Sequence, residues 1–133
     1  MQANSPALGS LTATRIRGIR RGVEKESLRA LSSGALALTP HPHGVGSALT
    51  HPHITTDFSE SQVELITGVQ ADAQAVVDEL ARIQHVTLRE MGEEMLWVSS
   101  MPCCLPADDA IPLGHYGSSN VGRSKTVYRR GLG

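Results

Sequence analysis

The sequence predicts an α+β fold in which one main helix packs outside an antiparallel sheet. Residues 14–30 favour a strand, Ser32-Ser33-Gly34 favours a turn, and the apolar residues 35–38 would complete a hairpin. Residues 72–91 carry apolar side chains at the spacing of an amphipathic helix. The chain has 133 residues, enough for one modest core, and its 3% aromatic content with 13 glycines and 7 prolines indicates a loop-rich, lightly packed one.

The balance of charge limits the classes of partner. A net charge of −1 excludes a general binder of nucleic acid or of membrane surfaces, because such proteins need an excess of Lys and Arg. Acidic residues are confined to the interval from Glu24 to Asp109, so both ends of the chain are basic. No apolar run is long enough for a secretion signal or a membrane span. We expect a cytoplasmic protein whose Cys103 and Cys104 remain thiols.

Residues 1–13 are small and polar and are predicted to form a loose lead-in to a domain that covers residues 14–133.

Two carboxylates lie close together in the first predicted strand. In a strand, Glu24 and Glu26 would point to the same sheet face, because successive side chains alternate between faces. Neighbouring carboxylates repel each other and suit a hard divalent cation such as Mg²⁺. A solvated strand face would carry the same pair, so both interpretations stay open.

Residues 39–53 form a loop rich in Pro, Gly and His. Its two His-Pro-His repeats contribute four imidazoles, His41, His43, His51 and His53. Imidazole is a good ligand for zinc, copper and nickel, so a metal site is one interpretation of this loop. A polar surface loop is the other, because the proline within each repeat holds its two histidines extended and apart.

A second acidic pair follows in residues 54–67, which favour a strand with a bulge at Ser59-Glu60-Ser61. Asp57 and Glu64 are an odd number of residues apart, so strict alternation would place them on opposite faces. A bulge would return them to the same face. Together with the earlier pair, four carboxylates would then suit more than one Mg²⁺ around the phosphates of a nucleotide. Separate solvated acids are the alternative.

The remaining elements are predicted from capping and apolar pattern. Asp72 is a suitable N-cap for the helix, which Gly92 ends, and its buried stripe is predicted to be Val76, Leu80, Ile83, Thr87 and Met91. Residues 97–106 are predicted to form a buried extended segment with both cysteines packed inside. Residues 116–126 resemble a phosphate loop, but Lys and Thr fall two positions late for a Walker A motif. A basic Gly/Ser loop remains, either solvated or in contact with an anion.

Taken together, these stretches resemble the N-terminal part of the proteobacterial glutamate–cysteine ligase family. The resemblance extends from about residue 18 onward and depends on the order and combination of its motifs. These are RGVEKESLR at 21–29, GSALTH at 46–51, ITTDFSE at 54–60, SMPC at 100–103, YGSSNVG at 116–122 and KTVYR at 125–129.

The resemblance implies a glutamine-synthetase-like fold, of which this chain would hold an incomplete antiparallel sheet. It implies a ligase that uses Mg²⁺ and ATP to phosphorylate the γ-carboxylate of L-glutamate and then joins it to L-cysteine, the first step of glutathione biosynthesis. The positions that match the family's metal ligands are Glu24, Glu26, Asp57 and Glu64. Phe58 and Tyr128 match positions near the cysteine pocket.

The resemblance also implies that family enzymes run several times further, and that the rest supplies further metal ligands and substrate-holding residues. We therefore expect a truncated N-terminal part that has no ligase activity as an isolated chain. Two alternatives remain open. One is a non-catalytic metal-binding module built on the four loop histidines, and the other is a degenerate remnant without a stable fold.

Overall fold

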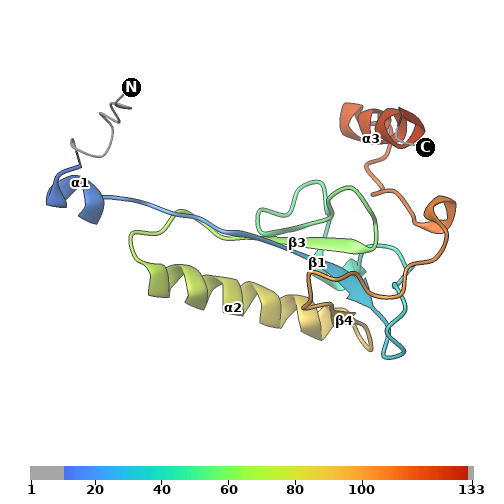
Figure 1. Cartoon of the computed structure of the whole chain (residues 1–133), viewed down its shortest axis with the longest axis horizontal. Helices are drawn as coiled ribbons and strands as arrows, with labels where there is room; N and C mark the ends of the chain where they lie inside the picture. Colours follow the sequence, from blue (N-terminus) through green and yellow to red (C-terminus); the bar gives the residue numbers. More distant parts are fainter. Residues whose placement is uncertain (1–10, 132–133) are drawn as a thin grey trace, which may run out of the picture.

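The computed structural model describes residues 11–131, so the predicted lead-in over residues 1–13 lies mostly outside the described part. Three helices and four short strands account for its regular structure, with two single 3₁₀ turns between them (Figure 1). In chain order the elements are α1 (Ala13–Arg17), β1 (Glu24–Ala30), η1 (His43–Val45), β2 (Ile54–Thr55), β3 (Gln62–Ile66), α2 (Ala73–Glu90), β4 (Met95–Leu96), η2 (Asp108–Ala110) and α3 (Asn120–Gly131).

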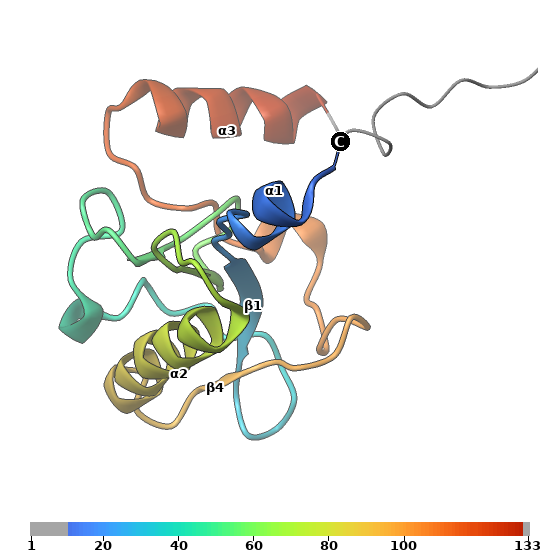
Figure 2. The ribbon, with the colours of Figure 1, turned by 90° about the vertical axis from the view of Figure 1, so that its left-hand side faces the viewer.

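The strands form one antiparallel sheet in the order β2-β3-β1-β4. Its central pair is β1 with β3, in which Glu26 lies directly opposite Glu64. Helix α2 lies along one face of this pair, and α3 lies on the other side of the sheet (Figure 2). The predicted α+β class, with an antiparallel sheet and a main helix outside it, is confirmed.

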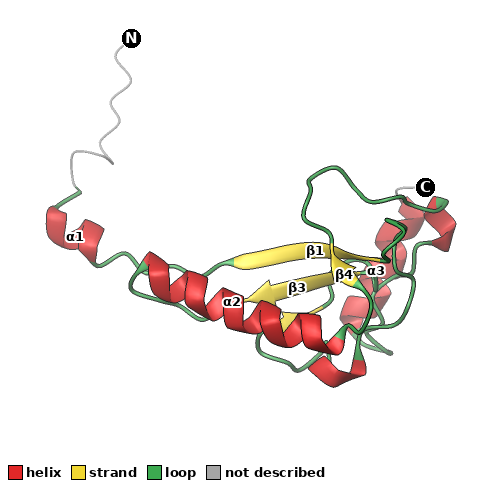
Figure 3. Cartoon of the chain, turned by 90° about the horizontal axis from the view of Figure 1, so that it is seen from below, coloured by secondary structure: helices red, strands yellow, loops and turns green. Residues whose placement is uncertain are grey.

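The core fills the space between the sheet and α2, which Figure 3 shows lying along the strands. Val63 and Leu65 of β3 are fully buried and pack against Ile83 of α2 and Met91 at its end. Because side chains alternate along a strand, Glu64 between them faces away from this core. The remaining members of the cluster are Val45, Ile54, Leu80 and Leu96. One sheet face is therefore committed to packing, and the opposite face is free to carry charge.

Helix α2 forms as its sequence predicts. The Asp72 carboxylate accepts a hydrogen bond from the Ala75 N–H at 2.9 Å, which caps the first turn. Gly92 follows the helix with φ +64°, a conformation that L side chains rarely adopt. The predicted stripe faces the core, with Leu80 partly buried and the other four residues buried. None of the helices within residues 11–131 has the length and apolar character needed to cross a bilayer.

The strand predicted for residues 14–30 is wrong over its first half. Residues 13–17 form α1, and the strand begins only at Glu24. The Thr12 hydroxyl accepts a hydrogen bond from the Arg15 N–H at 3.2 Å, and this cap favours a helical turn over an extended start. Between the two elements, Arg21 makes a single bridge to Gln70.

The turn after β1 is confirmed. The Gly34 N–H donates to the Leu31 carbonyl at 2.9 Å, and Gly34 has φ +82°. The second strand of the predicted hairpin is reduced to one bridge, between Ala30 and Leu36. Beyond that bridge the segment pairs elsewhere, since the Leu36 N–H donates to the Cys104 carbonyl at 3.0 Å.

The bulged strand predicted for residues 54–67 is instead a hairpin of β2 and β3. The Gln62 N–H donates to the Ser59 carbonyl at 3.0 Å and closes the connection between them. In the register of this pair, Thr55 lies directly opposite Glu64. Asp57 follows Thr55 by two residues, so chain reversal, and not a bulge, brings its carboxylate near that of Glu64.

Two predictions for the C-terminal third are also wrong. Within residues 97–106, Cys103 is buried as predicted, but Cys104 is exposed, and Val98 and Met101 are 93% and 74% exposed. The Gly/Ser loop is short, because residues 120–131 form α3. The Ser119 hydroxyl accepts a hydrogen bond from the Gly122 N–H at 3.2 Å, which is the pattern of a helix N-cap. The sequence did not predict this helix start, because glycine disfavours helix and the stretch contains Gly117 and Gly122.

Candidate functional site

Four carboxylates lie on or beside the sheet face that points away from α2. Glu24 and Glu26 of β1 share this face, and Glu64 of β3 is the direct partner of Glu26. Asp57 lies at the end of β2, in the connection to β3. We call these four residues the acidic face. The fold therefore brings together four acids that come from two segments about thirty residues apart.

The acidic face carries negative charge that is only partly compensated. Burial raises the pKa of the Glu64 carboxyl above its ordinary value. The charges of Glu24, Glu26 and Asp57 raise that pKa further. The Lys125 ammonium acts in the opposite direction and is a weaker influence. A cation bound among these oxygens would relieve this repulsion.

The donor set fits Mg²⁺ in chemistry, since all its ligands would be carboxylate oxygens. Contacts within the protein nevertheless hold two of the four acids. The Gln62 side-chain amide donates to Glu26 Oε2 at 2.8 Å, and Lys125 Nζ lies 3.5 Å from Asp57 Oδ1. Across residues 11–131, no three His, Cys, Asp or Glu side chains are arranged so that they could hold one metal ion. Metal binding would require these contacts to change.

A cavity of about 440 Å³ adjoins the acidic face on the side of α3. We call it the aromatic cavity, because Phe58 and Tyr128, the two residues predicted to lie near the cysteine pocket, both line it. Its other lining residues are Asn120, Val121, Ser124 and Lys125. The guanidinium carbon of Arg129 lies 5.9 Å from the centroid of the Phe58 ring, within the range of a cation–π contact.

Sequence reasoning missed the connection between the acidic face and the aromatic cavity. Lys125 extends from α3 to the backbone carbonyl of Asp57 and to the Tyr116 hydroxyl. Tyr116 is buried and also donates to the carbonyl oxygen of Thr56. No signal in the sequence identifies this contact, because it depends on where α3 returns to the hairpin.

The four histidines of the His loop, residues 39–53, do not gather into a metal-binding group in the described part of the chain. His51 Nδ1 accepts hydrogen bonds from the N–H groups of His53 and Ile54 at 3.1 and 2.9 Å. His53 Nδ1 lies 2.9 Å from the Ile66 carbonyl oxygen. The Nδ1 atoms of these two imidazoles thus hold the loop in place by bonding to the backbone.

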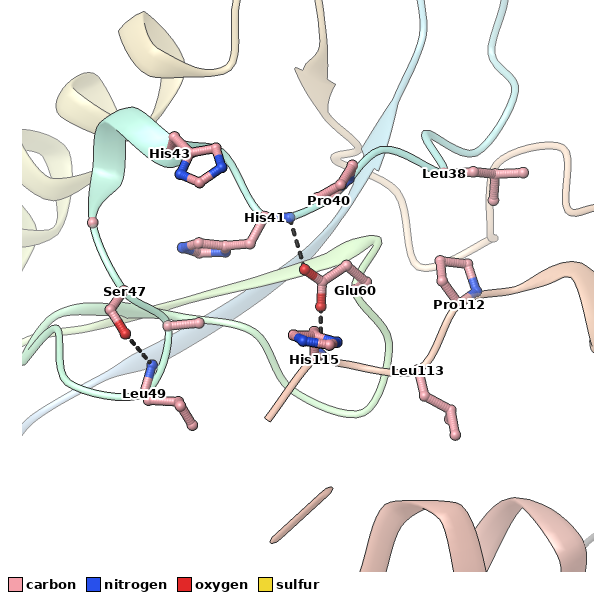
Figure 4. Close-up of a pocket in the computed structure, with 12 residues that line it drawn as sticks. Leu38, Pro40, His41, His43, Ser47, Leu49, Glu60, Pro112, Leu113 and His115 are labelled. Carbon is pink, nitrogen blue, oxygen red and sulfur yellow. Dashed lines mark hydrogen bonds between the residues drawn. The ribbon is translucent and has the colours of Figure 1, made fainter. Parts of the chain in front are cut away.

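The other two histidines of the loop line a larger cavity, of about 830 Å³ (Figure 4). Glu60 also lines this cavity. Its carboxylate accepts hydrogen bonds from the backbone N–H groups of His41 at 2.8 Å and His115 at 2.6 Å. Both ring nitrogens of His41 are buried without a partner, and burial lowers the pKa of this imidazole. Glu60 therefore fixes the shape of this cavity through the backbone.

A buried arginine, Arg29, connects the His loop and the β2–β3 connection to the sheet. Arg29 of β1 is 1% exposed and donates to the Thr39 hydroxyl at 2.8 Å and the Glu60 carbonyl at 2.9 Å. It also forms an ion pair with Glu94 at 2.5 Å. Because Arg29 lies on the same strand as Glu26, this network fixes the His loop and the β2–β3 connection relative to the acidic face.

Comparisons with known proteins agree with this architecture. A family model described as glutamate-cysteine ligase matches residues 9–133. The glutamate–cysteine ligase of Alcanivorax borkumensis is 51% identical over 126 residues, which cover 95% of this chain and 24% of that protein. The corresponding protein of Aliivibrio salmonicida is 54% identical over 112 residues, covering 84% of this chain and 22% of that protein.

A solved structure of a family member also matches the fold of this chain. The crystal structure of glutamate–cysteine ligase from Francisella tularensis in complex with AMP has a TM-score of 0.77 and 42% identity, covering 85% of this chain and 23% of that chain. The chain spans about a quarter of the length of the curated relatives it matches. By its sequence and by its fold, the chain belongs to the glutamate–cysteine ligase family.

Proposed function

We propose that this chain forms one wall of a glutamate–cysteine ligase active site. The reaction is the ATP- and Mg²⁺-dependent ligation of the L-glutamate γ-carboxylate to L-cysteine through an acyl phosphate, the first step of glutathione biosynthesis. The observation that carries the proposal is the single acidic face beside an aromatic cavity, at the positions that the family resemblance assigns to metal and cysteine. The AMP bound to the Francisella relative supports a nucleotide substrate.

In this proposal the acidic face holds Mg²⁺ through Glu24, Glu26, Asp57 and Glu64. Bound Mg²⁺ supplies screening of the charge on the transferred phosphoryl group and orients it for in-line attack. The chain's own contribution is to hold the carboxylates on a paired, twisted sheet, where the direct register of Glu26 with Glu64 fixes their separation. Their mutual repulsion, which raises the pKa of Glu64, would be relieved by a bound cation.

The aromatic cavity is proposed to receive L-cysteine. Phe58 and Tyr128 offer ring edges and faces to a sulfur atom, a contact that is favourable for thiols and thioethers. Tyr128 is 66% exposed in this chain, so the cavity is open on one side. Substitution of either ring by Ala is expected to raise the KM for cysteine more than the KM for glutamate or ATP.

The isolated chain is proposed to be inactive and the complete enzyme cytoplasmic, where ATP and both amino acids are present. Its length is about a quarter of that of its relatives, and catalysis requires all reacting groups to be positioned at once. We expect no glutamate- and cysteine-dependent ADP release from the chain of 133 residues above that of a Glu24→Gln control.

The activity is tested in a chimera, in which the 85% of this chain that matches the Francisella enzyme replaces the corresponding segment of that enzyme. We expect ADP release that depends on glutamate and cysteine. Glu26→Gln in the chimera should lower kcat by about a hundredfold, the scale for loss of one charge-stabilising group. Glu93→Gln, at an exposed site beyond α2, is the matched control. A chimera whose activity does not respond to Glu26→Gln would contradict the proposal.

A further inference from the structure

Lys125 is a positioned cation and not a free surface lysine. Its side chain is 14% exposed. Its ammonium lies 3.5 Å from Asp57 Oδ1 and donates to the Asp57 carbonyl oxygen. It also donates to the Tyr116 hydroxyl at 3.2 Å and lies 4.3 Å above the centroid of that ring. Four separate contacts therefore fix one positive charge at the edge of the acidic face.

The platform under this ammonium is built by close packing. Tyr116 is 8% exposed, and its hydroxyl oxygen lies 3.1 Å from the Asp57 carbonyl oxygen. A Cβ at Gly114 would lie 2.7 Å from Tyr116 Cε2 and 2.8 Å from the Asp57 carbonyl oxygen. Glycine at this position is what lets the ring approach the backbone of Asp57. The ring then offers its face to the Lys125 cation.

We propose that Lys125 is the internal counter-ion of the acidic face, which holds Asp57 while no divalent cation is bound and gives way when one binds. The inference rests on the proposed metal role of the acidic face. An ammonium and Mg²⁺ compete for the same carboxylate oxygen, and two cations a few ångströms apart repel each other. Lysine suits an exchange of this kind, because its ammonium is a compact charge on a flexible stem.

The exchange connects metal binding to the aromatic cavity. Lys125 and Tyr128 lie three residues apart on α3, on the same side of the helix, and both line that cavity. Arg129 donates to the carbonyl oxygens of Asp108 and Ile111 at 2.7 and 3.1 Å, so α3 keeps a second attachment when Lys125 leaves Asp57. Metal binding would thus change how α3 sits beside Phe58 without detaching it.

The test is a titration of the chain with MgCl₂, followed by calorimetry and by NMR of the backbone and the Lys125 side chain. Lys125→Met keeps the apolar stem and removes the charge, and we expect its affinity for Mg²⁺ to rise roughly tenfold. Lys125→Arg keeps the charge and should bind Mg²⁺ like the wild type. Tyr116→Phe removes only the hydroxyl and should change the affinity by less than about twofold.

The wild-type chain gives an independent readout. Mg²⁺ is expected to move the resonances of the Lys125 ε-methylene and of α3 together with those of β1, even if Lys125→Met does not fold. Equal affinity in the wild type and Lys125→Met, or shifts in β1 without any at Lys125, would overturn the counter-ion role while leaving the metal site in place. Absence of Mg²⁺ binding in the wild type and in both Lys125 variants would overturn the metal role and the counter-ion role together.

Discussion

The acidic face and the His loop are both dense groups of titratable side chains, and the fold uses them in opposite ways. In the His loop, His51 and His53 direct ring nitrogens to the backbone, where they stabilise a long connection. On the acidic face, the charges of three carboxylates raise the pKa of Glu64, and one lysine offsets them only in part. The acidic face is therefore the better candidate for cation binding, because the fold leaves part of its negative charge uncompensated.

The largest expected effect would break the network that supports the His loop. Arg29→Met removes a fully buried cation and leaves Glu94 and the Glu60 carbonyl without their donor. We expect a loss of about 3–5 kcal/mol in the free energy of unfolding, measured by urea titration. Arg82→Met, at an exposed position of α2, is the control and should change the free energy by less than about 0.5 kcal/mol. Similar effects of the two substitutions would contradict the role assigned to Arg29.

A smaller effect separates the structural from the metal-binding interpretation of the His loop. His51→Ala removes the acceptor of two backbone N–H groups, and we expect a loss of about 1–3 kcal/mol in unfolding free energy. His51→Asn retains a side-chain acceptor near the same place and should recover part of that loss. If His51→Ala instead preserved stability and abolished zinc binding, the loop would be a metal site.

On the acidic face, loss of a charge should stabilise the metal-free chain. Glu26 lies directly opposite Glu64, and like charges in a cross-strand pair are unfavourable. Glu26→Gln is expected to raise the unfolding free energy by about 0.5 kcal/mol without Mg²⁺ and to remove that gain in millimolar Mg²⁺. The same urea titration, run with and without the ion, measures both. A destabilised variant in metal-free buffer would show that the face is not strained by repulsion.

The smallest expected effect distinguishes the two regions by pH. The folded-state pKa of Glu64 is raised. Its contribution to the free energy of unfolding is therefore fully present below the unfolded pKa and is lost as pH rises through the folded pKa. The folded-state pKa of His41 is lowered by burial, so its contribution is present above the unfolded pKa and is lost as pH falls through the folded pKa. The quantity to measure is the free energy of unfolding as a function of pH. Glu64→Gln should reduce its decrease with rising pH, and His41→Gln should reduce its decrease with falling pH. Slopes that do not respond to these substitutions would contradict the assignment.

The sequence predicted the parts of this fold that depend on local pattern. The cap at Asp72 and the stripe of α2 are local, and so is the alternation that puts Glu24 and Glu26 on one face. Chain reversal at Ser59 is not, because a Ser-Glu-Ser stretch is compatible with a bulge as well as with a hairpin. Helix α3 was also missed, since Gly122 has a low helix propensity although its N–H donates to the capping Ser119 hydroxyl at 3.2 Å.

The candidate site divides in the same way. The residue types of the acidic face are visible in the sequence, and their proposed metal role comes from the family resemblance. The contact of Lys125 with Asp57 spans 68 residues and depends on tertiary packing, so no local pattern could indicate it. The histidines mislead in another way, because residue type alone does not show that His51 Nδ1 accepts from the N–H groups of His53 and Ile54, or that His53 Nδ1 contacts the Ile66 carbonyl.

The most direct test of the difference between the two regions is paramagnetic broadening by Mn²⁺, a mimic of Mg²⁺, in the NMR spectrum of the chain. Mn²⁺ accepts both carboxylate and imidazole ligands, so the ion itself reports which region it prefers. We predict that substoichiometric Mn²⁺ broadens the amide resonances around Glu24, Glu26 and Glu64, and that excess Mg²⁺ restores them. Broadening confined to the His loop, or left unchanged by Mg²⁺, would contradict the assignment of the acidic face as the metal-binding region.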